Sequence, residues 1–163
     1  DIIYQYGEER KSRRIAKKIV ETRKEHPIKT TFELADIVRS CVAKSRDGIA
    51  PATRTFQALR IAVKDELGEL ERALKAAEKI LKPDGKMVVV SFHSLEDGFV
   101  KRFFRDQSGG KAVSRYQPQI DTDAPVFELK TRKAIKPSDK EISENSRSRS
   151  ARLRAASYVG GKS

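Results

Sequence analysis

The sequence has one cysteine, two histidines and no long apolar run. A single cysteine cannot form an internal disulfide, so Cys41 indicates a reducing, cytoplasmic setting, and its place in the apolar pattern LADIVRSCV predicts a core residue rather than a nucleophile. No window approaches the roughly eighteen consecutive apolar residues of a transmembrane helix, and DIIYQYGEER lacks the order of a secretory signal. We therefore expect a soluble protein with no membrane partner.

Several catalytic sites are excluded because their residues are lacking. Neither Ser91 nor Ser94 is flanked by the glycines of a hydrolase nucleophile elbow. Zinc needs converging ligands, and only His26, His93 and Cys41 could offer nitrogen or sulfur. No glycine-rich loop follows an apolar strand. The sequence therefore predicts no serine hydrolase, no zinc site and no phosphate-cradling loop.

Positive charge is abundant and concentrated in two stretches. The chain carries 35 Lys and Arg against 23 Asp and Glu, a formal net charge of +12. Residues 7–26 hold eight basic residues against four acidic ones, and residues 130–154 hold nine against three. Clustered positive charge neutralises phosphates and releases counterions, which favours nucleic acid as a partner. A basic surface that is merely solvated is the alternative.

The N-terminal half of the sequence has the periodicity of helices. Apolar residues predict amphipathic helices over residues 7–24 and from Thr30 or Thr31 onward, followed by a loop at residues 44–51. From Ala52 one long helix is expected, with a bend at Gly68 and an end in the turn at residues 82–85. Its apolar residues fall on one stripe: Phe56, Leu59, Val63, Leu67, Leu70, Leu74, Ala77 and Leu81.

The C-terminal half alternates strand and helix signals. The run Met87–Phe92 shows no polar alternation, which predicts a strand buried on both faces. A helix over Leu95–Asp106 follows, with Leu95, Phe99, Val100, Phe103 and Phe104 on its inner face. After a loop at residues 108–125, residues 126–135 and 150–159 predict two closing antiparallel strands. Helix, tight turn, apolar strand and helix is the rhythm of an α/β sheet with parallel strands.

Polar residues cluster where the apolar strand ends. In an open α/β sheet, ligands bind beyond the carboxyl ends of the strands. Ser94 and Asp97 fit a helix-start pattern in which Ser94 caps and Asp97 reaches back, so both are expected to be structural. His93 is left exposed at the tip, either as a site residue or as a satisfied loop histidine. The candidate site residues are Ser91, His93, Ser94, Glu96 and Asp97.

Four motifs occur in a recognisable order: GEERKSRRIAKKIVETR, ATRTFQALRIAVKDELGELERAL, FHSLED with the following VKRFFRD, and ENSRSRSARLRAA. In this order they resemble the bacterial RsmH/MraW family, and the resemblance covers nearly the whole chain. That family methylates the N4 amino group of a cytosine in small-subunit ribosomal RNA with S-adenosylmethionine. One departure is Ser146, where the family usually has proline.

The resemblance implies the C-terminal portion of such an enzyme. The implied fold is α/β: the C-terminal part of a Rossmann-like class I methyltransferase sheet plus part of an all-α insertion domain. Residues 1–52 would be the remainder of the helical RNA-recognition insert, and residues 53–163 the C-terminal half of the methyltransferase domain. The family's glycine-rich loop and acidic ribose contact are not in this sequence. The S-adenosylmethionine pocket would therefore lie mainly in the missing N-terminal half, and the catalytic base is not identified.

Position and resemblance together suggest roles for individual residues. His93, with Ser91 and Ser94, is expected to orient the target base, and Glu96 and Asp97 to support that loop; Phe92 is a weaker candidate for stacking on the base. Residues at the start of the long helix either contact substrate or form an ordinary capped start: Arg54, Thr55, Gln57 and Arg60. Candidate phosphate contacts are Arg10, Arg13, Arg14, Lys17 and Lys18, and Arg147, Arg149, Arg152 and Arg154.

Two functions remain open from the sequence. The first is methylation of ribosomal RNA by an enzyme of which this chain is a part, inactive alone, with the small ribosomal subunit and the missing N-terminal half as partners. The second is a non-catalytic RNA-binding or ribosome-assembly module. In either case strand 87–92 would lack neighbours in isolation, which predicts an exposed apolar face, partner-dependent stability or self-association.

Overall fold

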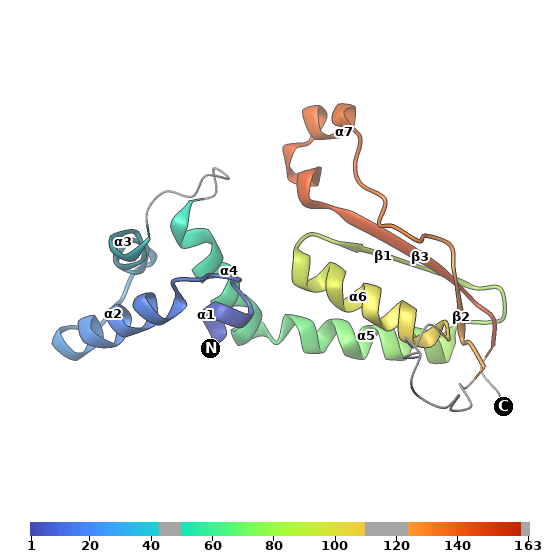
Figure 1. Ribbon diagram of the computed structural model, residues 1–163, viewed down its shortest axis with the longest axis horizontal. Helices are drawn as coiled ribbons and strands as arrows, with labels where there is room; N and C mark the ends of the chain where they lie inside the picture. Colours follow the sequence, from blue (N-terminus) through green and yellow to red (C-terminus); the bar gives the residue numbers. More distant parts are fainter. Residues whose placement is uncertain (43–49, 110–123, 161–163) are drawn as a thin grey trace, which may run out of the picture. The chain divides into compact units, whose positions relative to one another are not determined.

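The computed structural model describes residues 1–42, 50–109 and 124–160 and divides into two compact units, Asp1–Glu66 and Leu67–Ser163 (Figure 1). The first unit ends at Glu66 and the second begins at Leu67; the division of the family's domains near residue 52 stays a prediction. Most of the predicted loops at residues 44–51 and 108–125 lies outside the described residues. Within the described part of the chain, no helix is both long and apolar enough to cross a membrane.

The first unit is helical. It comprises α1 (Ile2–Gln5), α2 (Ser12–Glu25), α3 (Thr31–Cys41) and α4 (Pro51–Lys64). Each helix contributes to one apolar core, which is why α4 belongs to this unit. The buried core residues are Ile3, Ile15, Ala35, Val38, Cys41 and Ala52. The prediction that Cys41 is a core residue is confirmed.

The start of α3 is a capping box centred on Thr30, one of the two predicted caps. The Glu33 backbone N–H donates to Thr30 Oγ1 at 3.2 Å, and Glu33 Oε2 accepts from the backbone N–H of Thr30 at 3.0 Å and of Lys29 at 2.6 Å. These N–H groups, Lys29 first and then Thr30, hold the pKa of Glu33 below its ordinary value. Charge on Glu33 therefore stabilises the helix start.

The predicted long helix is in fact two helices, and Gly68 is not where it bends. Asp65 adopts a left-handed backbone (φ 50°, ψ 39°) between α4 and α5 (Glu66–Ile80), and Gly68 lies inside α5. The single-stripe prediction fails with it: Val63 is 84% exposed. In α4 the buried positions are instead Ala52, Thr55, Ala58 and Ile61.

A close backbone contact packs the start of the chain on α4. A Cβ atom on Gly7 would lie 2.6 Å from the Ile3 carbonyl oxygen and 2.7 Å from the Arg54 carbonyl oxygen. Real side chains do not tolerate such distances, so only glycine lets the turn after α1 approach α4 this closely.

The second unit is a small sheet with helices. Along the chain it contains α5, β1 (Lys86–Ser91), α6 (Ser94–Gln107), β2 (Phe127–Leu129), α7 (Asp139–Glu144), the 3-10 helix η1 (Ser146–Ser150) and β3 (Arg152–Tyr158). The strand order is β1-β3-β2, and both pairings are antiparallel. The predicted antiparallel closing strands are confirmed, although β2 is short and the rest of residues 126–135 adds only an isolated bridge between Ile135 and Leu153. The parallel pairing expected from the helix–strand rhythm is absent among the described strands.

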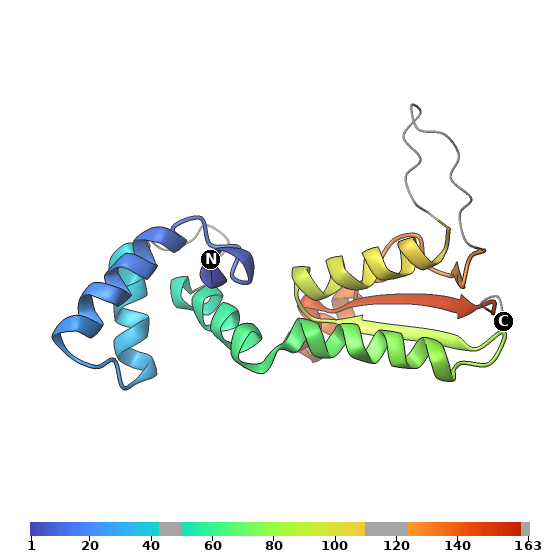
Figure 2. The ribbon, with the colours of Figure 1, turned by 90° about the horizontal axis from the view of Figure 1, so that it is seen from below.

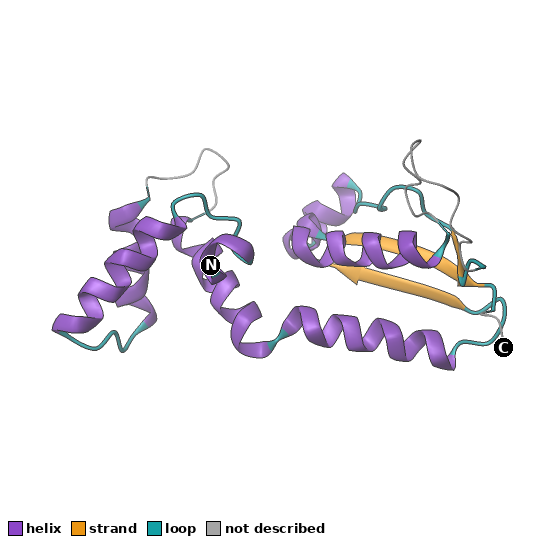
Figure 3. Ribbon diagram, turned by 60° about the horizontal axis from the view of Figure 1, so that its bottom comes forward, coloured by secondary structure: helices purple, strands orange, loops and turns teal. Residues whose placement is uncertain are grey.

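Helices α5 and α6 cover one face of this sheet, as Figure 2 and Figure 3 show. Leu74 of α5 and Val100 and Phe104 of α6 pack against Met87, Phe127 and Ala156 of the strands. Phe127 is the centre of an aromatic cluster, with ring centroids 5.7 Å from Phe104 and 5.6 Å from Tyr158. Val100, Phe104 and the flanking Phe99 and Phe103 all face this core, as the sequence predicted for α6.

The opposite face of β1 is apolar and exposed. Alternate side chains point away from the core: Val88 is 56% exposed, Val90 49% and Phe92 56%. The expectation of a strand buried on both faces is therefore wrong for these residues, and the exposed apolar face expected for the strand in isolation is confirmed. β1 is also an edge strand, since β3 is its one partner among the described strands.

Candidate functional site

His93, predicted to lie exposed at the strand tip with no local duty, is the N-cap of α6. Its Nδ1 accepts a hydrogen bond from the Glu96 backbone N–H at 3.3 Å, and its side chain is only 11% exposed. Its extended backbone (φ −141°, ψ 163°) is typical of a cap. The expectation that Ser94 caps the helix is therefore wrong: Ser94 is the first helical residue, one position further along.

Glu96 completes the capping arrangement from the first turn of α6. Its Oε2 accepts from the Phe92 backbone N–H at 2.9 Å, and its Oε1 lies 3.1 Å from His93 Nε2. Because Nδ1 accepts a hydrogen bond, a neutral imidazole carries its proton on Nε2. That nitrogen is buried and has no hydrogen-bond partner of suitable geometry among the described residues.

Asp97 and Arg154 form a bidentate ion pair that joins α6 to β3. Arg154 Nε donates to Asp97 Oδ1 at 2.8 Å, and a terminal guanidinium nitrogen donates to Oδ2 at 3.0 Å. The Arg154 side chain is 11% exposed and the Asp97 side chain is 22% exposed. Arg154 therefore does not lie free on the surface as a phosphate contact, and the Asp97 carboxylate holds α6 against β3.

The other residues at this end of the sheet fall into buried and exposed sets. Ser91 is buried and its Oγ donates to the Arg152 carbonyl oxygen at 3.4 Å, across the antiparallel pair. Arg152 is half-buried and donates to the Ala151 carbonyl oxygen at 2.7 Å. Arg147 and Arg149 of η1 are exposed just before β3 begins. Of the predicted C-terminal arginines, these two are the most accessible to a phosphate.

The strand tip does not by itself fit S-adenosylmethionine. Both carboxylate oxygens of Asp97 lie on Arg154, and those of Glu96 lie on the Phe92 backbone N–H and beside His93. Both acids are thus already engaged by groups of the protein itself. The described tip residues cap α6 and join it to β3.

In the first unit, the predicted basic residues of α2 are exposed. They are Arg10, just before the helix, and Arg13, Arg14, Lys17 and Lys18. Lys17 lies 3.9 Å from Glu21 in a solvent-exposed pair, and such pairs contribute little. These side chains are accessible to a phosphate-bearing partner, and their role as phosphate contacts stays a prediction.

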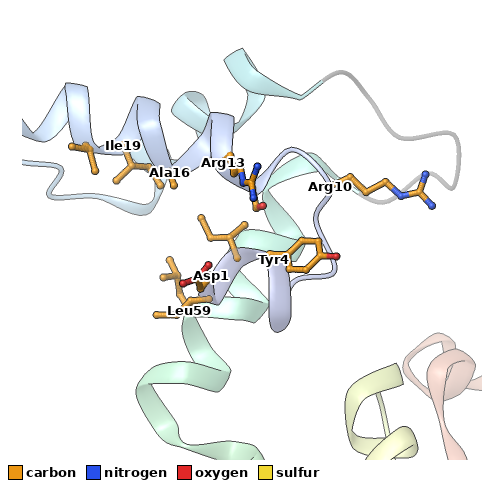
Figure 4. A pocket seen from close by; sticks show the side chains of 11 residues that line it. Asp1, Tyr4, Arg10, Arg13, Ala16, Ile19 and Leu59 are labelled. Atoms are coloured by element: carbon orange, nitrogen blue, oxygen red, sulfur yellow. The ribbon is translucent and has the colours of Figure 1, made fainter.

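An open groove of about 780 Å³ lies along α1, α2 and α4, and Arg10 and Arg13 are at its rim (Figure 4). Its walls are mainly apolar and come from Ile2, Ile3, Ala16, Ile19, Val20 and Leu59. Tyr4, 63% exposed, also lines it. The sequence predictions did not include Tyr4, which stands six positions before Arg10.

The residues predicted at the start of the long helix have different environments. Thr55 is fully buried and its Oγ1 has no hydrogen-bond partner among the described residues, so it is not placed to touch a substrate. Arg54 is half-buried. Gln57 and Arg60 line a second groove of about 510 Å³ between α3 and α4, where Arg60 Nε lies 2.9 Å from Glu66.

The fold and these surfaces define a class of protein: one unit with helices on one face of a small antiparallel sheet, and one basic helical unit suited to phosphate-rich partners. Comparison with known proteins makes the assignment more specific. Residues 1–159 match the model of the MraW methylase family, and the chain belongs to this family.

Curated relatives are similar over nearly all of the chain. They include the ribosomal RNA small subunit methyltransferase H of Rhodospirillum rubrum, 56% identical over 95% of this chain, and the proteins of the same name from Granulibacter bethesdensis, 57% over 95%, and Paramagnetospirillum magneticum, 58% over 96%. The matched regions cover 49%, 47% and 50% of those proteins. The chain thus spans about half the length of the curated relatives it matches.

Proposed function

We propose that the chain is part of an S-adenosylmethionine-dependent enzyme that methylates the N4 amino group of a cytosine in small-subunit ribosomal RNA in the cytoplasm. The observation that carries this proposal is membership of the MraW methylase family over residues 1–159, together with relatives named for ribosomal RNA methylation. In this proposal the 163 residues alone are inactive, and they act with the segment of the relatives that they do not match.

The exposed side of β1 supports a larger sheet. Val88, Val90 and Phe92 form an apolar row, and by register Leu153 and Ala155 of β3 lie on the same face. A free strand edge and an apolar sheet face both favour further polypeptide, because they leave backbone groups and apolar area without partners. We propose that the unmatched segment adds strands to the β1 edge and covers this face, which would make the sheet Rossmann-like. The pocket for the methyl donor would lie mainly on that segment.

The two basic regions would hold the RNA. Arg13, Arg14 and Lys18 of α2, and Arg147 and Arg149 of η1, are exposed and can neutralise phosphates. The strand tip would position rather than react: the cap formed by His93 and Glu96 fixes the backbone next to the proposed target base. S-adenosylmethionine would supply the electrophilic methyl group when bound.

Titration calorimetry with S-adenosylmethionine tests this proposal. The chain is measured alone and after coexpression with the unmatched segment of the Rhodospirillum rubrum relative, and binding is expected only for the combination. Methylation of small-subunit ribosomal RNA is then followed by mass spectrometry of nucleosides, with N4-methylcytidine as the expected product. A combined protein that binds RNA, does not bind the cofactor and does not methylate the RNA would instead support a non-catalytic RNA-binding or assembly module.

A further inference from the structure

The groove between α1 and α2 combines a flat aromatic ring with accessible guanidinium groups. Tyr4 contributes the ring, and Arg10 and Arg13 contribute the charge. In Figure 4 these three side chains lie towards one end of the groove, while Ala16, Ile19 and Leu59 lie towards the other. All of these residues belong to the first unit, so the groove is complete within it.

The charges at the rim are not neutralised by the protein. Arg10 and Arg13 have no ion pair with any residue in the described ranges 1–42, 50–109 and 124–160, whereas Arg39 and Arg60 of the second groove each contact a carboxylate. Asp1 is the one acidic residue among those that line the first groove. An occupant with negative charge at the rim is therefore favoured, and an apolar peptide would leave both guanidinium groups without a partner.

The exposed Tyr4 ring adds a second requirement. A tyrosine that is 63% exposed beside apolar walls offers one face for stacking. A nucleobase has a flat apolar face, its sugar can lie on aliphatic side chains, and its phosphate meets arginine. Paired bases are already stacked within their duplex, so an unpaired nucleotide fits this combination best.

We propose that this groove binds one unpaired nucleotide of an RNA strand, with the base stacked on Tyr4 and the flanking phosphates on Arg10 and Arg13. The proposal rests on the proposed function, because it takes RNA as the partner. It adds a location on α1 and α2 for a nucleotide of the substrate, and a preference for single-stranded RNA.

Fluorescence anisotropy of the 163-residue chain with a labelled 12-nucleotide RNA tests the proposal, and the same RNA annealed to its complement is the second probe. Tyr4→Ala should weaken single-strand binding by roughly 5- to 150-fold, the range that one stacked base supports, and leave duplex binding within about twofold. Tyr4→Phe should retain the affinity. Arg13→Gln should lower the single-strand salt slope by about 0.7.

Matched variants on other faces provide the controls. Phe32→Ala removes a 78% exposed aromatic ring in the second groove and should not change single-strand affinity. Arg14→Gln removes a neighbouring charge outside the groove and should reduce the affinity for single-stranded and duplex RNA equally. Far-UV circular dichroism establishes that each variant retains its helices.

Three outcomes would overturn the proposal. They are a Tyr4→Ala variant that binds both RNAs like wild type, an equal loss for Phe32→Ala, and a wild-type chain that binds neither RNA. Dimerisation or binding of the unmatched segment that is lost in Tyr4→Ala without a change in RNA affinity would assign the groove to protein contacts. None of these outcomes depends on cofactor binding or methyl transfer, so the proposed activity is judged separately.

Discussion

The ion pair between Asp97 and Arg154 makes the sharpest stability prediction. Asp97→Asn and Arg154→Met each remove one charge and nearly preserve side-chain volume. In both variants the remaining charged group stays in a poorly hydrated site, since the partners are 22% and 11% exposed. Removing one member of a fully buried pair costs about 3–5 kcal/mol, and the residual exposure lowers our expectation to about 2–3 kcal/mol for each variant.

The double variant separates the pair from the individual groups. When both charges are removed, no unpaired ion remains, so the loss should be smaller than the sum of the single losses by about 1–2 kcal/mol. Because the chain has two compact units, a global unfolding curve would mix them. Native-state hydrogen exchange of peptides from β1 and β3 measures the relevant unit directly, and each single variant should accelerate their exchange by roughly 30- to 150-fold.

Arg105→Ala is the matched control on the same helix. Its pair with Asp106 is 53% and 52% exposed, so the change should alter stability by less than about 0.5 kcal/mol. Single-variant losses as small as that of Arg105→Ala, or strictly additive losses in the double variant, would refute the claim that the pair fixes α6 on β3.

Three further predictions concern capping, backbone contact and pH. In the enzyme assembled with the unmatched segment, His93→Asn should keep the cap and the melting temperature but lower methyl transfer, whereas His93→Ala should also cost about 1 kcal/mol of stability. Gly7→Ala should destabilise the first unit by about 2 kcal/mol, because the added Cβ meets two carbonyl oxygens. Gly98→Ala should stabilise α6 by about 0.5–1 kcal/mol, because its Cβ approaches only Arg102 at 3.5 Å. Hydrogen exchange of peptides from each unit measures both effects. Because the pKa of Glu33 is lowered in the folded protein, the Glu33 charge contributes fully to stability above the ordinary pKa of 4.5, and this contribution is lost as the pH falls through the lower folded pKa. Wild type and Glu33→Gln should therefore differ in the hydrogen exchange of α3 at pH 7 and converge in acid.

Each of these has a contrary result. Wild-type turnover in His93→Asn would make His93 a cap and nothing more. Equal effects of alanine at positions 7 and 98 would contradict the close approach of the Gly7 turn to α4. A gap between wild type and Glu33→Gln that persists unchanged to low pH would show that the Glu33 charge is not what stabilises the start of α3.

Local patterns predicted much of the secondary structure. The Thr30 cap with Glu33 three residues later, and the inner face of α6, follow from spacing alone, because capping and burial depend on near neighbours in a helix. The break at Asp65 was not predicted, since helical phase continues through it and aspartate adopts the left-handed conformation at modest cost. Glycine was the wrong marker for this bend.

For the candidate site, the sequence predicted where polar residues gather but not how they pair. Polar residues at the end of an apolar strand identified residues 91–97 correctly as a cluster, but not which of them were already paired. Arg154 and Asp97 are 57 positions apart in sequence, and Arg147 has the same charge without that partner. Charge counts treat the two arginines alike, whereas the strand register places one against α6 and leaves the other exposed.

The disagreement over β1 has a physical meaning of its own. Apolar residues at 88, 90 and 92 predicted burial, yet all three are about half exposed or more in the described chain. A solvated sheet face would be expected to carry polar residues at alternate positions, and Lys86 is the one charged side chain on this face of β1. The apolar pattern is what the proposed larger sheet would require, whereas the exposure shows what the described residues bury by themselves. If the proposed unmatched segment covers this face, polar substitutions at Val88 and Val90 should weaken its association more than they weaken this unit, and an unchanged association measured by pull-down would contradict the proposal.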